Sequence, residues 1–447
     1  MKTQREYPRV TITPKGERAV VAGHPWVYEG EVLDVAPAPG AEPGADVENG
    51  ALVDVVSKKG AYLGTGTISQ MSKIRVRLVS RNANDRFDDA FWERKVSWAW
   101  AYRKAVMGAD ATCCRVIFSE ADGFPGLIVD RFGDVLVAQV LSVGMERQKD
   151  AIFGALVRVL CTDGVALRGV YERSDVGTRK LEGLDEHVGW WPGAGSVGAV
   201  GPGADADADG AAGPGPTTVE ICENAVRYLV DFEHGQKTGF FLDQKYNRRA
   251  VAGLARGRRV LDCFTHTGSF ALNAAMGGAE RVHAVDISEL AVDMARANAR
   301  LNGLEERVSF ETCNVFDLLP ELERAGGRRG AGDGTGAAGL RGGPFDFIVL
   351  DPPAFTKNRR TVDAAERGYH EINQRAMKIL PRGGYLATCS CSHFMDVERF
   401  RRMLASAAHD ANVQLRQIEE RQQAPDHPIL WGVPETDYLK FFLFQVV

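Results

Sequence analysis

Hydrophobic positions in the first part of the chain alternate over short stretches, as they do in β-strands. Residues 8–80 contain runs such as VTIT, ALVDVVS and KIRVRLVS, which Gly and Pro separate. This pattern predicts a small barrel or sandwich. Residues 87–107 then carry apolar and aromatic side chains at helical spacing and predict a helix. Three strands joined by turns at Asp122–Gly123 and Gly133–Asp134, a helix near 145–160 and a strand near 167–172 complete a predicted α+β region.

From residue 258 the pattern changes to apolar strands that alternate with helices. The runs RVLDCF, RVHAVD, VSFET, FDFIVLD and YLATCS predict strands, and the tail YLKFFLFQVV predicts one more. Helices are expected at 268–276, 288–301 and 361–380, with Ser288 as an N-cap and Asn302–Gly303 as a C-terminal cap. The alternation predicts an α/β fold: a doubly wound, Rossmann-like sheet that binds its ligand at the carboxyl ends of the strands.

Two segments rich in Gly and Ala interrupt these patterns. Residues 191–216 and 325–343 carry too few apolar side chains to offset the entropy of ordering, so we expect both to be disordered loops. The chain is thus predicted to hold a small β domain at 8–82, an α+β middle domain at 85–190 and the doubly wound domain at 217–447.

Composition limits the classes of protein that the chain can belong to. Of 447 residues, 45% are hydrophobic and 25% charged, which are ordinary values for a globular protein. We expect a soluble cytoplasmic protein without a membrane span, because no apolar run approaches about 20 residues and MKTQREYPRV lacks a signal core. An organelle is not excluded. The eight cysteines include no C-x-x-C pair, so neither a structural metal nor a disulfide framework is expected.

The turn after the first strand of the doubly wound domain indicates which ligand that domain binds. It has one glycine, Gly268, where a pyrophosphate site would need G-x-G-x-x-G, and it begins with an acid, Asp262. Both features favour a cationic ligand without phosphate, and S-adenosylmethionine is such a ligand. Asp286 ends the second strand and is expected to bind the ribose hydroxyls, and a polar residue, Asn314, follows the third strand.

The ends of the fourth and fifth strands carry candidate catalytic groups. Asp351 in DPPAF is expected to bind a flat amino-bearing base, on which Phe355 can stack. Cys389 and Cys391 in TCSCSH suggest methylation of cytosine, because carbon 5 becomes nucleophilic once a thiolate has added to carbon 6. The alternative for these thiols is that they are small buried hydrophobic groups.

Several strings together resemble those of a known family. GQKTGFFLDQ (235–244), DCFTHTGSF, DPPAF and TCSCSH are similar to those of the PUA-domain-containing, S-adenosylmethionine-dependent large-subunit rRNA cytosine-5 methyltransferases. The resemblance extends to HPWVYEGEV and EADGFPGLIVDRFG, and so covers nearly the whole chain outside the two Gly- and Ala-rich segments. It implies a PUA-like RNA-binding domain, a middle α+β domain and a class I methyltransferase domain acting on large-subunit rRNA.

The resemblance also implies roles for individual residues. Asp351 would hold the target base, Cys389 would be the nucleophile, and Cys391 or His393 would assist product release. The residues implied at the cofactor are Gln244, Asp262, Phe264, Thr267, Gly268, Asp286, Asn314 and Asp351.

Three positions depart from the family pattern. Asn314 replaces an Asp, Lys245 replaces an Arg with loss of its planar fork, and Ala354 stands where many RNA cytosine-5 methyltransferases have a second cysteine. We expect Asn314 to alter the affinity for the cofactor rather than to abolish binding.

The RNA contact is expected in the basic stretch 73–104, which carries a charge of +5 in a chain of −5. Arg75 and Arg77 alternate on one strand and could follow a phosphate backbone; the alternative is a solvated edge strand. Two other functions stay open: an rRNA guanine methyltransferase of the related 7-methylguanosine group, and a non-catalytic RNA-binding ribosome assembly factor. A homodimer is compatible with the sequence, which does not fix the oligomeric state.

Overall fold

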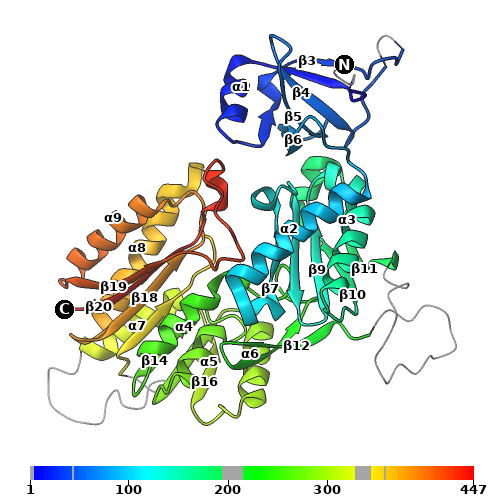
Figure 1. Cartoon of the computed structure of the whole chain (residues 1–447). Coiled ribbons are helices and arrows are strands. Elements are labelled where there is room, and N and C mark those ends of the chain that lie inside the picture. The colour runs from blue at the N-terminus through cyan, green and yellow to red at the C-terminus, as the bar shows by residue number, and fades with distance from the viewer. Residues whose placement is uncertain (1–4, 43–44, 194–214, 328–343, 357–358) are drawn as a thin grey trace. The chain divides into compact units, whose positions relative to one another are not determined.

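The computed structural model describes residues 5–42, 45–193, 215–327, 344–356 and 359–447 (Figure 1). Most of both segments predicted as disordered therefore lies outside the described residues. The chain forms two compact units. The first unit contains Met1–Glu220, Val230–Leu242 and Pro425–Thr436, and the second contains Ile221–Leu229, Asp243–Ala424 and Asp437–Val447.

The first sheet of the first unit is built from the N-terminal strands. Val10, Val27, Val53 and Val76 from four of these strands are 0% exposed in one hydrophobic core. Thr13 caps α1 (Pro14–Val21) because its hydroxyl oxygen accepts from the Gly16 amide at 3.2 Å. In sheet order the strands are β2 (Trp26–Tyr28), β6 (Ile74–Ser80), β5 (Tyr62–Ile68), β4 (Leu52–Ser57), β1 (Arg9–Ile12) and β3 (Val32–Ala36). Strands β2 and β3 are separated by a turn of 3₁₀ helix at Glu29–Glu31.

The second sheet of the first unit confirms the predicted α+β region. The helices expected at 87–107 and near 145–160 are α2 (Asp89–Met107) and α3 (Val143–Thr162), which pack side by side. The turn after Phe132 needs Gly133, whose φ is +61°. In sheet order the strands are β11 (His187–Trp190), β10 (Gly169–Ser174), β9 (Val135–Val140), β8 (Leu127–Phe132) and β7 (Cys113–Phe118).

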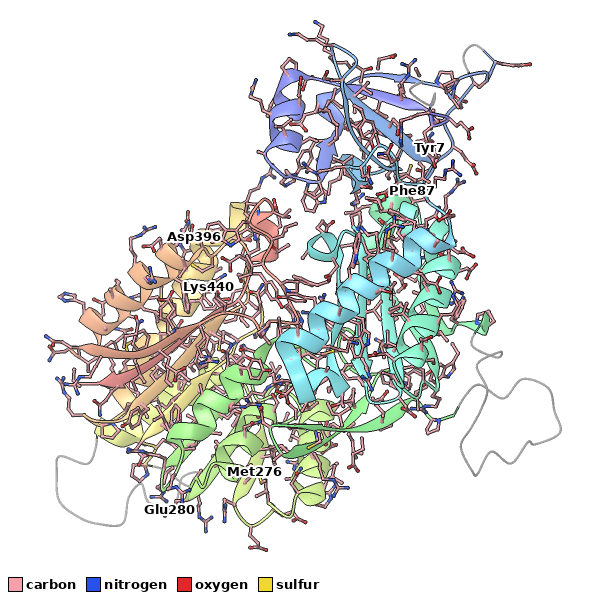
Figure 2. The ribbon with its side chains drawn as sticks, viewed as in Figure 1. Tyr7, Phe87, Met276, Glu280, Asp396 and Lys440 are labelled. Carbon is pink, nitrogen blue, oxygen red and sulfur yellow. The ribbon has the colours of Figure 1, made fainter. Side chains whose placement is uncertain are left out.

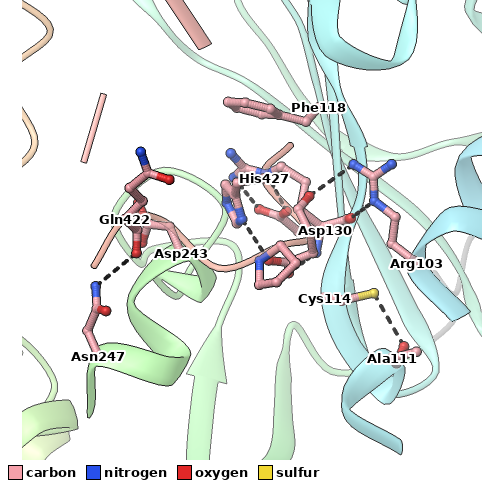
Figure 3. A network of polar contacts seen from close by, with 12 residues as sticks. Arg103, Ala111, Cys114, Phe118, Asp130, Asp243, Asn247, Gln422 and His427 are labelled. Atoms are coloured by element: carbon pink, nitrogen blue, oxygen red, sulfur yellow. Dashed lines mark hydrogen bonds and ion pairs between the residues drawn. The ribbon is translucent and has the colours of Figure 1, made fainter. Parts of the chain in front are cut away.

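A late segment of the chain, Pro425–Thr436, also belongs to the first unit. A bulge in β7 after Arg115 breaks the strand pairing there, and the Arg115 amide donates to Asp426 Oδ2 at 2.9 Å. Arg103 donates to the main-chain oxygen of Asp426 at 2.9 Å, and His427 Nδ1 lies 2.9 Å from Asp426 Oδ1 (Figure 3). Asp426 and His427 are buried, so they fasten this segment by its polar groups.

The second unit contains the predicted doubly wound sheet. Its first five strands in chain order are parallel, and the apolar tail forms β20, which is antiparallel to β18. The run FDFIVLD forms a shorter strand than predicted, because β17 covers only Phe347–Leu350. In sheet order the strands are β16 (Val308–Thr312), β15 (Arg281–Asp286), β14 (Arg259–Cys263), β17, β18 (Tyr385–Ser390), β20 (Lys440–Val446) and β19 (Leu415–Arg421).

Strand β14 is the point at which the strand order reverses. Its two neighbours, β15 and β17, are followed by helices on opposite faces in a doubly wound sheet, and such a sheet is expected to bind its ligand at the carboxyl ends of these three strands. The structure thus brings the predicted motifs of the second unit to one edge of the sheet.

The helices of the second unit begin where the sequence places caps and breakers. The Ser288 hydroxyl accepts from the Ala291 amide at 3.3 Å, which confirms the predicted N-cap. Helices α7, α8 and α9 share one buried core with β17, β18 and β20. Among the described residues, no helix is long and apolar enough to span a membrane. The helices are α4 (Lys245–Leu254), α5 (Ser269–Met276), α6 (Glu289–Leu301), α7 (Val315–Gly327), α8 (Val362–Ile379) and α9 (Val397–Asp410), and a hairpin of β12 (Thr218–Glu223) and β13 (Val226–Asp231) precedes them.

Candidate functional site

Asp262 anchors the turn that follows β14. The residue is 0% exposed, and its Oδ2 accepts from the Thr265 hydroxyl at 2.6 Å and from the Ala271 amide at 2.9 Å. Its Oδ1 is buried without a hydrogen-bond partner among the described residues. Burial raises the pKa of Asp262 to about 7, and the charges of Asp351 and Asp286 add to this rise.

The same turn is held in an unusual backbone conformation. Phe264 and His266 have φ of 65° and 51°, and Gly268 has φ of 86°. A Cβ at Gly268 would lie 3.1 Å from the Ala295 Cβ, so glycine is required by the packing of the turn on α6. The main-chain oxygen of Thr267 accepts from Asn298 Nδ2 at 3.0 Å. These contacts fix the shape of the predicted cofactor loop.

Asp286 at the end of β15 contributes to the same turn. Its Oδ2 accepts from the His266 amide at 2.8 Å and its Oδ1 from the Ser288 amide at 3.0 Å. Since a carboxylate offers about four lone-pair positions, these two bonds leave acceptor capacity for a ligand. The predicted ribose contact stays a prediction.

Asn314 lies between β16 and α7, where its side chain caps the helix. Its Oδ1 accepts from the Phe316 amide at 3.0 Å. The oxygen expected to accept from the adenine amine therefore already holds a main-chain amide, and an adenine contact would use its second lone pair.

Asp351 is the centre of a polar cluster at the exit from β17. Its Oδ1 accepts from Gln244 Nε2 at 2.9 Å, and the Cys389 thiol also makes a hydrogen bond with this carboxyl group. Burial raises the pKa of Asp351 to about 7, the negative charge of Asp243 adds to this rise, and the bonds from Cys389 and Gln244 oppose it. The structure thus joins Gln244, Asp351 and Cys389, which come from three separate predicted motifs.

Asn247 completes this cluster, although the sequence analysis did not single it out. Its Nδ2 donates to Gln244 Oε1 at 2.6 Å and to the main-chain oxygen of Gln422 at 3.3 Å, the second of which is drawn in Figure 3. Because Gln244 and Asn247 lie three residues apart at the start of α4, they are neighbours on the helix surface, and this spacing was the available signal.

The two predicted thiols differ in their surroundings. Cys389 lies within β18 and is 0% exposed, and burial raises its pKa well above the usual value. Cys391 follows the end of the strand, is partly exposed, and has its Sγ 4.0 Å from the main-chain oxygen of Pro352. His393 is exposed. Which group attacks a substrate stays a prediction.

Aromatic and basic side chains support the exit from β18. The Tyr369 hydroxyl lies 3.0 Å from Ser392 Oγ, and Lys440 Nζ donates to the main-chain oxygen of Ser392 at 2.7 Å. The ring of Phe355, expected to stack on a base, lies 4.6 Å from the Tyr369 ring centroid to centroid. The sequence analysis missed Tyr369 and Lys440, although a lysine within the apolar run YLKFFLF was a visible signal.

Arg75 and Arg77 lie on β6, which is paired on both sides by β2 and β5. The alternative of a solvated edge strand is therefore wrong. Arg75 is ion-paired with Glu29 at 2.6 Å, and Arg77 with the buried Glu182 at 2.9 Å. Both guanidinium groups thus have partners within the first unit, and their contact with RNA stays a prediction.

The edge formed by β14, β15 and β17 fits a cationic cofactor. Asp351 and Asp286 each repel the carboxylate of Asp262, and a buried oxygen of Asp262 lacks a partner among the described residues. A ligand that carries a sulfonium and an ammonium group would relieve this repulsion. Within the described part of the chain, no group of three or more His, Cys, Asp or Glu side chains is arranged to hold a metal ion.

Comparison with known proteins agrees with this chemistry. The S-adenosylmethionine-dependent methyltransferase family matches residues 203–444, and the PUA-like domain family matches residues 10–81. The chain is 35% identical to ribosomal RNA large subunit methyltransferase I of Klebsiella pneumoniae, over 100% of both chains. It is 37% identical to the protein of that name from Shewanella denitrificans, over 98% of this chain and 99% of the relative.

Solved structures show the same fold. A SAM-dependent methyltransferase from Streptococcus mutans superposes with a TM-score of 0.73 at 20% identity, covering 98% of this chain and 100% of that one. A methyltransferase structure complexed with SAH superposes with a TM-score of 0.74 at 21% identity and the same coverage.

Proposed function

The chain belongs to the S-adenosylmethionine-dependent methyltransferases, among the ribosomal RNA large subunit methyltransferase I proteins, and from this membership we propose that it methylates carbon 5 of a cytidine in large-subunit rRNA. The observation that carries the proposal is the pairing of β17 with β18. It sets an acid, Asp351, beside two thiols at the edge where the cofactor is expected. Methylation of a guanine nitrogen requires no thiol.

Asp351 is suited to recognise cytosine. With a pKa near 7, the carboxyl group exists in both protonation states at neutral pH. The protonated form can donate to ring nitrogen N3, and the ionised form can accept from the exocyclic amine. Gln244 and Asn247 support this role because they fix the orientation of the Asp351 carboxyl group.

We propose Cys391 as the attacking thiol. The family motif favours Cys389, but that sulfur is fully buried, is held by Asp351, and has a raised pKa. Cys391 lies two residues after Cys389, just beyond the end of β18, and is partly exposed. Its sulfur lies close to Pro352, the residue that follows Asp351. A reactive thiol needs both access and a favourable site for its thiolate, and Cys391 has the access.

The proposed reaction balances with groups of this chain. The Cys391 thiolate adds to carbon 6 as Asp351 gives its proton to N3, which makes carbon 5 nucleophilic. After methylation, His393 takes the proton from carbon 5, the carbon–sulfur bond breaks to release the thiolate, and Asp351 recovers its proton from N3. S-adenosylmethionine supplies the electrophilic methyl group. Asp262, Phe264, Thr267, Gly268, Asp286 and Asn314 are proposed to hold it.

The proposal is tested on unmodified large-subunit rRNA. The full-length protein is incubated with the RNA and S-adenosylmethionine carrying a deuterated methyl group, and the RNA is digested to nucleosides for mass spectrometry. We expect deuterated 5-methylcytidine. Labelled 7-methylguanosine would contradict the proposal in favour of the guanine-directed alternative, and the absence of any labelled nucleoside despite cofactor binding would favour a non-catalytic assembly factor.

A further inference from the structure

Lys440 is a buried lysine in the second unit, at the start of β20. It lies opposite Ser390 in the antiparallel register with β18, and it is 6% exposed. Its Nζ donates to the main-chain oxygens of Ser392 at 2.7 Å and Tyr438 at 2.8 Å. The first of these bonds reaches the residue directly after Cys391. Lys440 and Asp396 are labelled in Figure 2.

The ammonium group of Lys440 is charged without a close counter-ion. No carboxylate of the described residues lies within 4.0 Å of its Nζ. Of the interactions that favour its charge, the one with Cys391 is the largest, followed by those with Asp437 and Asp396. Burial lowers the pKa of Lys440 to about 8, so the group is mainly protonated at neutral pH. A buried charge that lacks a carboxylate is costly, and such costs concentrate at functional sites.

Two further described groups that interact with Cys391, Tyr369 and Cys389, are neutral at this pH. Burial raises the pKa of Tyr369 to about 12, and it raises that of Cys389 well above the usual value. Tyr369 comes from α8, Cys389 from β18 and Lys440 from β20, and both Tyr369 and Lys440 contact Ser392, the residue after Cys391. Of these three groups, Lys440 is the one that carries a positive charge at neutral pH.

We propose that Lys440 is a positioning residue for the methyl transfer, because its ammonium group stabilises the thiolate of Cys391 and its hydrogen bond holds the main chain at Ser392. The inference rests on the proposed function in taking Cys391 as the attacking thiol. The proton of that thiol passes to solvent, no covalent bond to Lys440 forms, and the ammonium group keeps its three protons. The lysine thus acts on the reaction through Cys391.

The first test uses the wild-type protein without RNA. The folded full-length chain is treated briefly with iodoacetamide between about pH 6 and 10, and the alkylated peptides are quantified by mass spectrometry, because thiolates are the reacting form. Cys222 is exposed and serves as the internal reference. Burial changes the maximal alkylation rate, but the midpoint pH follows ionisation. We expect the midpoint of Cys391 to lie about one pH unit below that of Cys222; equal or reversed midpoints would overturn the proposal.

The second test changes the lysine. Lys440→Met should raise the Cys391 midpoint by about one pH unit and slow methylation at neutral pH by about tenfold, with S-adenosylmethionine affinity unchanged. Lys440→Arg should restore the midpoint. The matched control is Lys15→Met, because Lys15 is exposed and lies in the first unit. An unchanged midpoint in Lys440→Met would overturn the proposal, and the wild-type comparison decides the matter if that variant does not fold.

These measurements separate the inference from the proposed function. Alkylation reports on Lys440 and Cys391 in the absence of RNA, whereas nucleoside analysis reports on the product. A lowered Cys391 midpoint together with labelled 7-methylguanosine would support the stabilisation of the Cys391 thiolate by Lys440 and would contradict methylation of cytosine. A normal midpoint together with labelled 5-methylcytidine would reject the role of Lys440 alone.

Discussion

Gln244 donates a hydrogen bond to Asp351 across 2.9 Å, and so joins the end of the GQKTGFFLDQ string to the first residue of DPPAF. The two residues are 107 positions apart. The bond favours the ionised form of a carboxyl group whose pKa is already raised to about 7. Gln244 therefore influences how much of Asp351 is protonated at neutral pH.

Removal of the Gln244 amide should raise the pKa of Asp351 further. We expect Gln244→Leu to move the alkaline limb of the methylation rate upward in pH and to cost about 1 kcal/mol of stability, typical of one lost hydrogen bond. Single-turnover rates between about pH 5.5 and 9 measure the shift. Gln374 on α8 is half-buried and donates to the main-chain oxygen of Asp410 at 3.3 Å, so Gln374→Leu is the control for loss of a glutamine hydrogen bond. A pH profile of Gln244→Leu that matches the wild type would contradict the role of Gln244.

Loss of the Asp286 carboxylate should weaken cofactor binding. In Asp286→Ala, each lost charge-assisted hydrogen bond to the ribose would contribute about 1.5–3 kcal/mol. Asp286→Asn keeps one acceptor oxygen and should lose less. Isothermal titration calorimetry with S-adenosylmethionine measures both variants. Asp286 also accepts from the His266 amide, so circular dichroism must show that both Asp286 variants are folded. Unchanged affinity would place the ribose elsewhere.

The two thiols can be separated with RNA that contains 5-fluorocytidine at the target position. Without a carbon-5 proton the adduct cannot be released, so a denaturation-stable protein–RNA complex accumulates. We expect this complex with the wild type and with Cys389→Ala, and none with Cys391→Ala. The reverse result would assign the attack to Cys389, as the motif predicts. Gel electrophoresis after denaturation provides the measurement, and cofactor binding shows that each variant is folded.

Arg75 and Arg77 should differ in stability when each is replaced by Gln. Arg77→Gln leaves Glu182, which is 3% exposed at its side chain, without its cation and should cost about 3 kcal/mol. Arg75→Gln breaks a pair with Glu29, which is 63% exposed, together with bonds to the main-chain oxygens of Ser69 and Gln70, and should cost about 1–2 kcal/mol. Urea unfolding measures both changes.

Arg75→Gln is therefore the variant that tests RNA binding without a large loss of stability. If Arg75 contacts a phosphate, the slope of log affinity against log salt should fall by about one unit. Filter binding at several salt concentrations measures the slope, and an unchanged affinity and slope would place the RNA surface elsewhere.

The stability of the cofactor-free protein should fall as pH rises through neutrality. Asp262 and Asp351 have pKa values raised to about 7, above the unfolded value of about 3.9. The folded chain therefore binds more protons than the unfolded chain, and the stability that these protons supply is present below about pH 4 and is lost as pH rises through about 7. Asp351→Asn should reduce this loss, whereas Asp34→Asn at an exposed position should not.

Thermal unfolding from about pH 5 to 8 measures this dependence. A cationic cofactor favours the ionised carboxylates, so the rise in Tm that S-adenosylmethionine produces should be larger at about pH 8 than at about pH 5. A cofactor-induced rise that is the same at both values would show that these carboxyl groups do not titrate with binding.

Sequence periodicity predicted the elements whose apolar pattern is strong. Strands β14, β15 and β18 are buried on both faces, so continuous apolar runs revealed them and fixed the motifs at their ends. Strand β19 was not predicted because polar side chains dominate its sequence, LRQIEER, which has no buried residue. The sequence analysis also gave no helix for α9.

Contacts between residues far apart in the chain could not be predicted from the sequence pattern. The distance between Arg77 and Glu182 along the chain gives no sign that they pair. Arg77 was expected to face RNA or solvent, so a buried acidic partner was not predicted. A period of two places Cys389 and Cys391 on one side of a strand, but it does not show that the strand ends between them. That end decides which thiol is accessible.

The assignment of Pro425–Thr436 to the first unit has a consequence for biosynthesis. The Arg115 amide in β7 takes its partner, Asp426, from 311 residues later in the chain. Translation from the N-terminus therefore delivers nearly all of the second unit before the first can complete its hydrogen bonds. During that interval the Arg115 amide lacks its native acceptor. A nascent chain that ends before Pro425 should therefore lack a segment that the first unit needs for its completed fold.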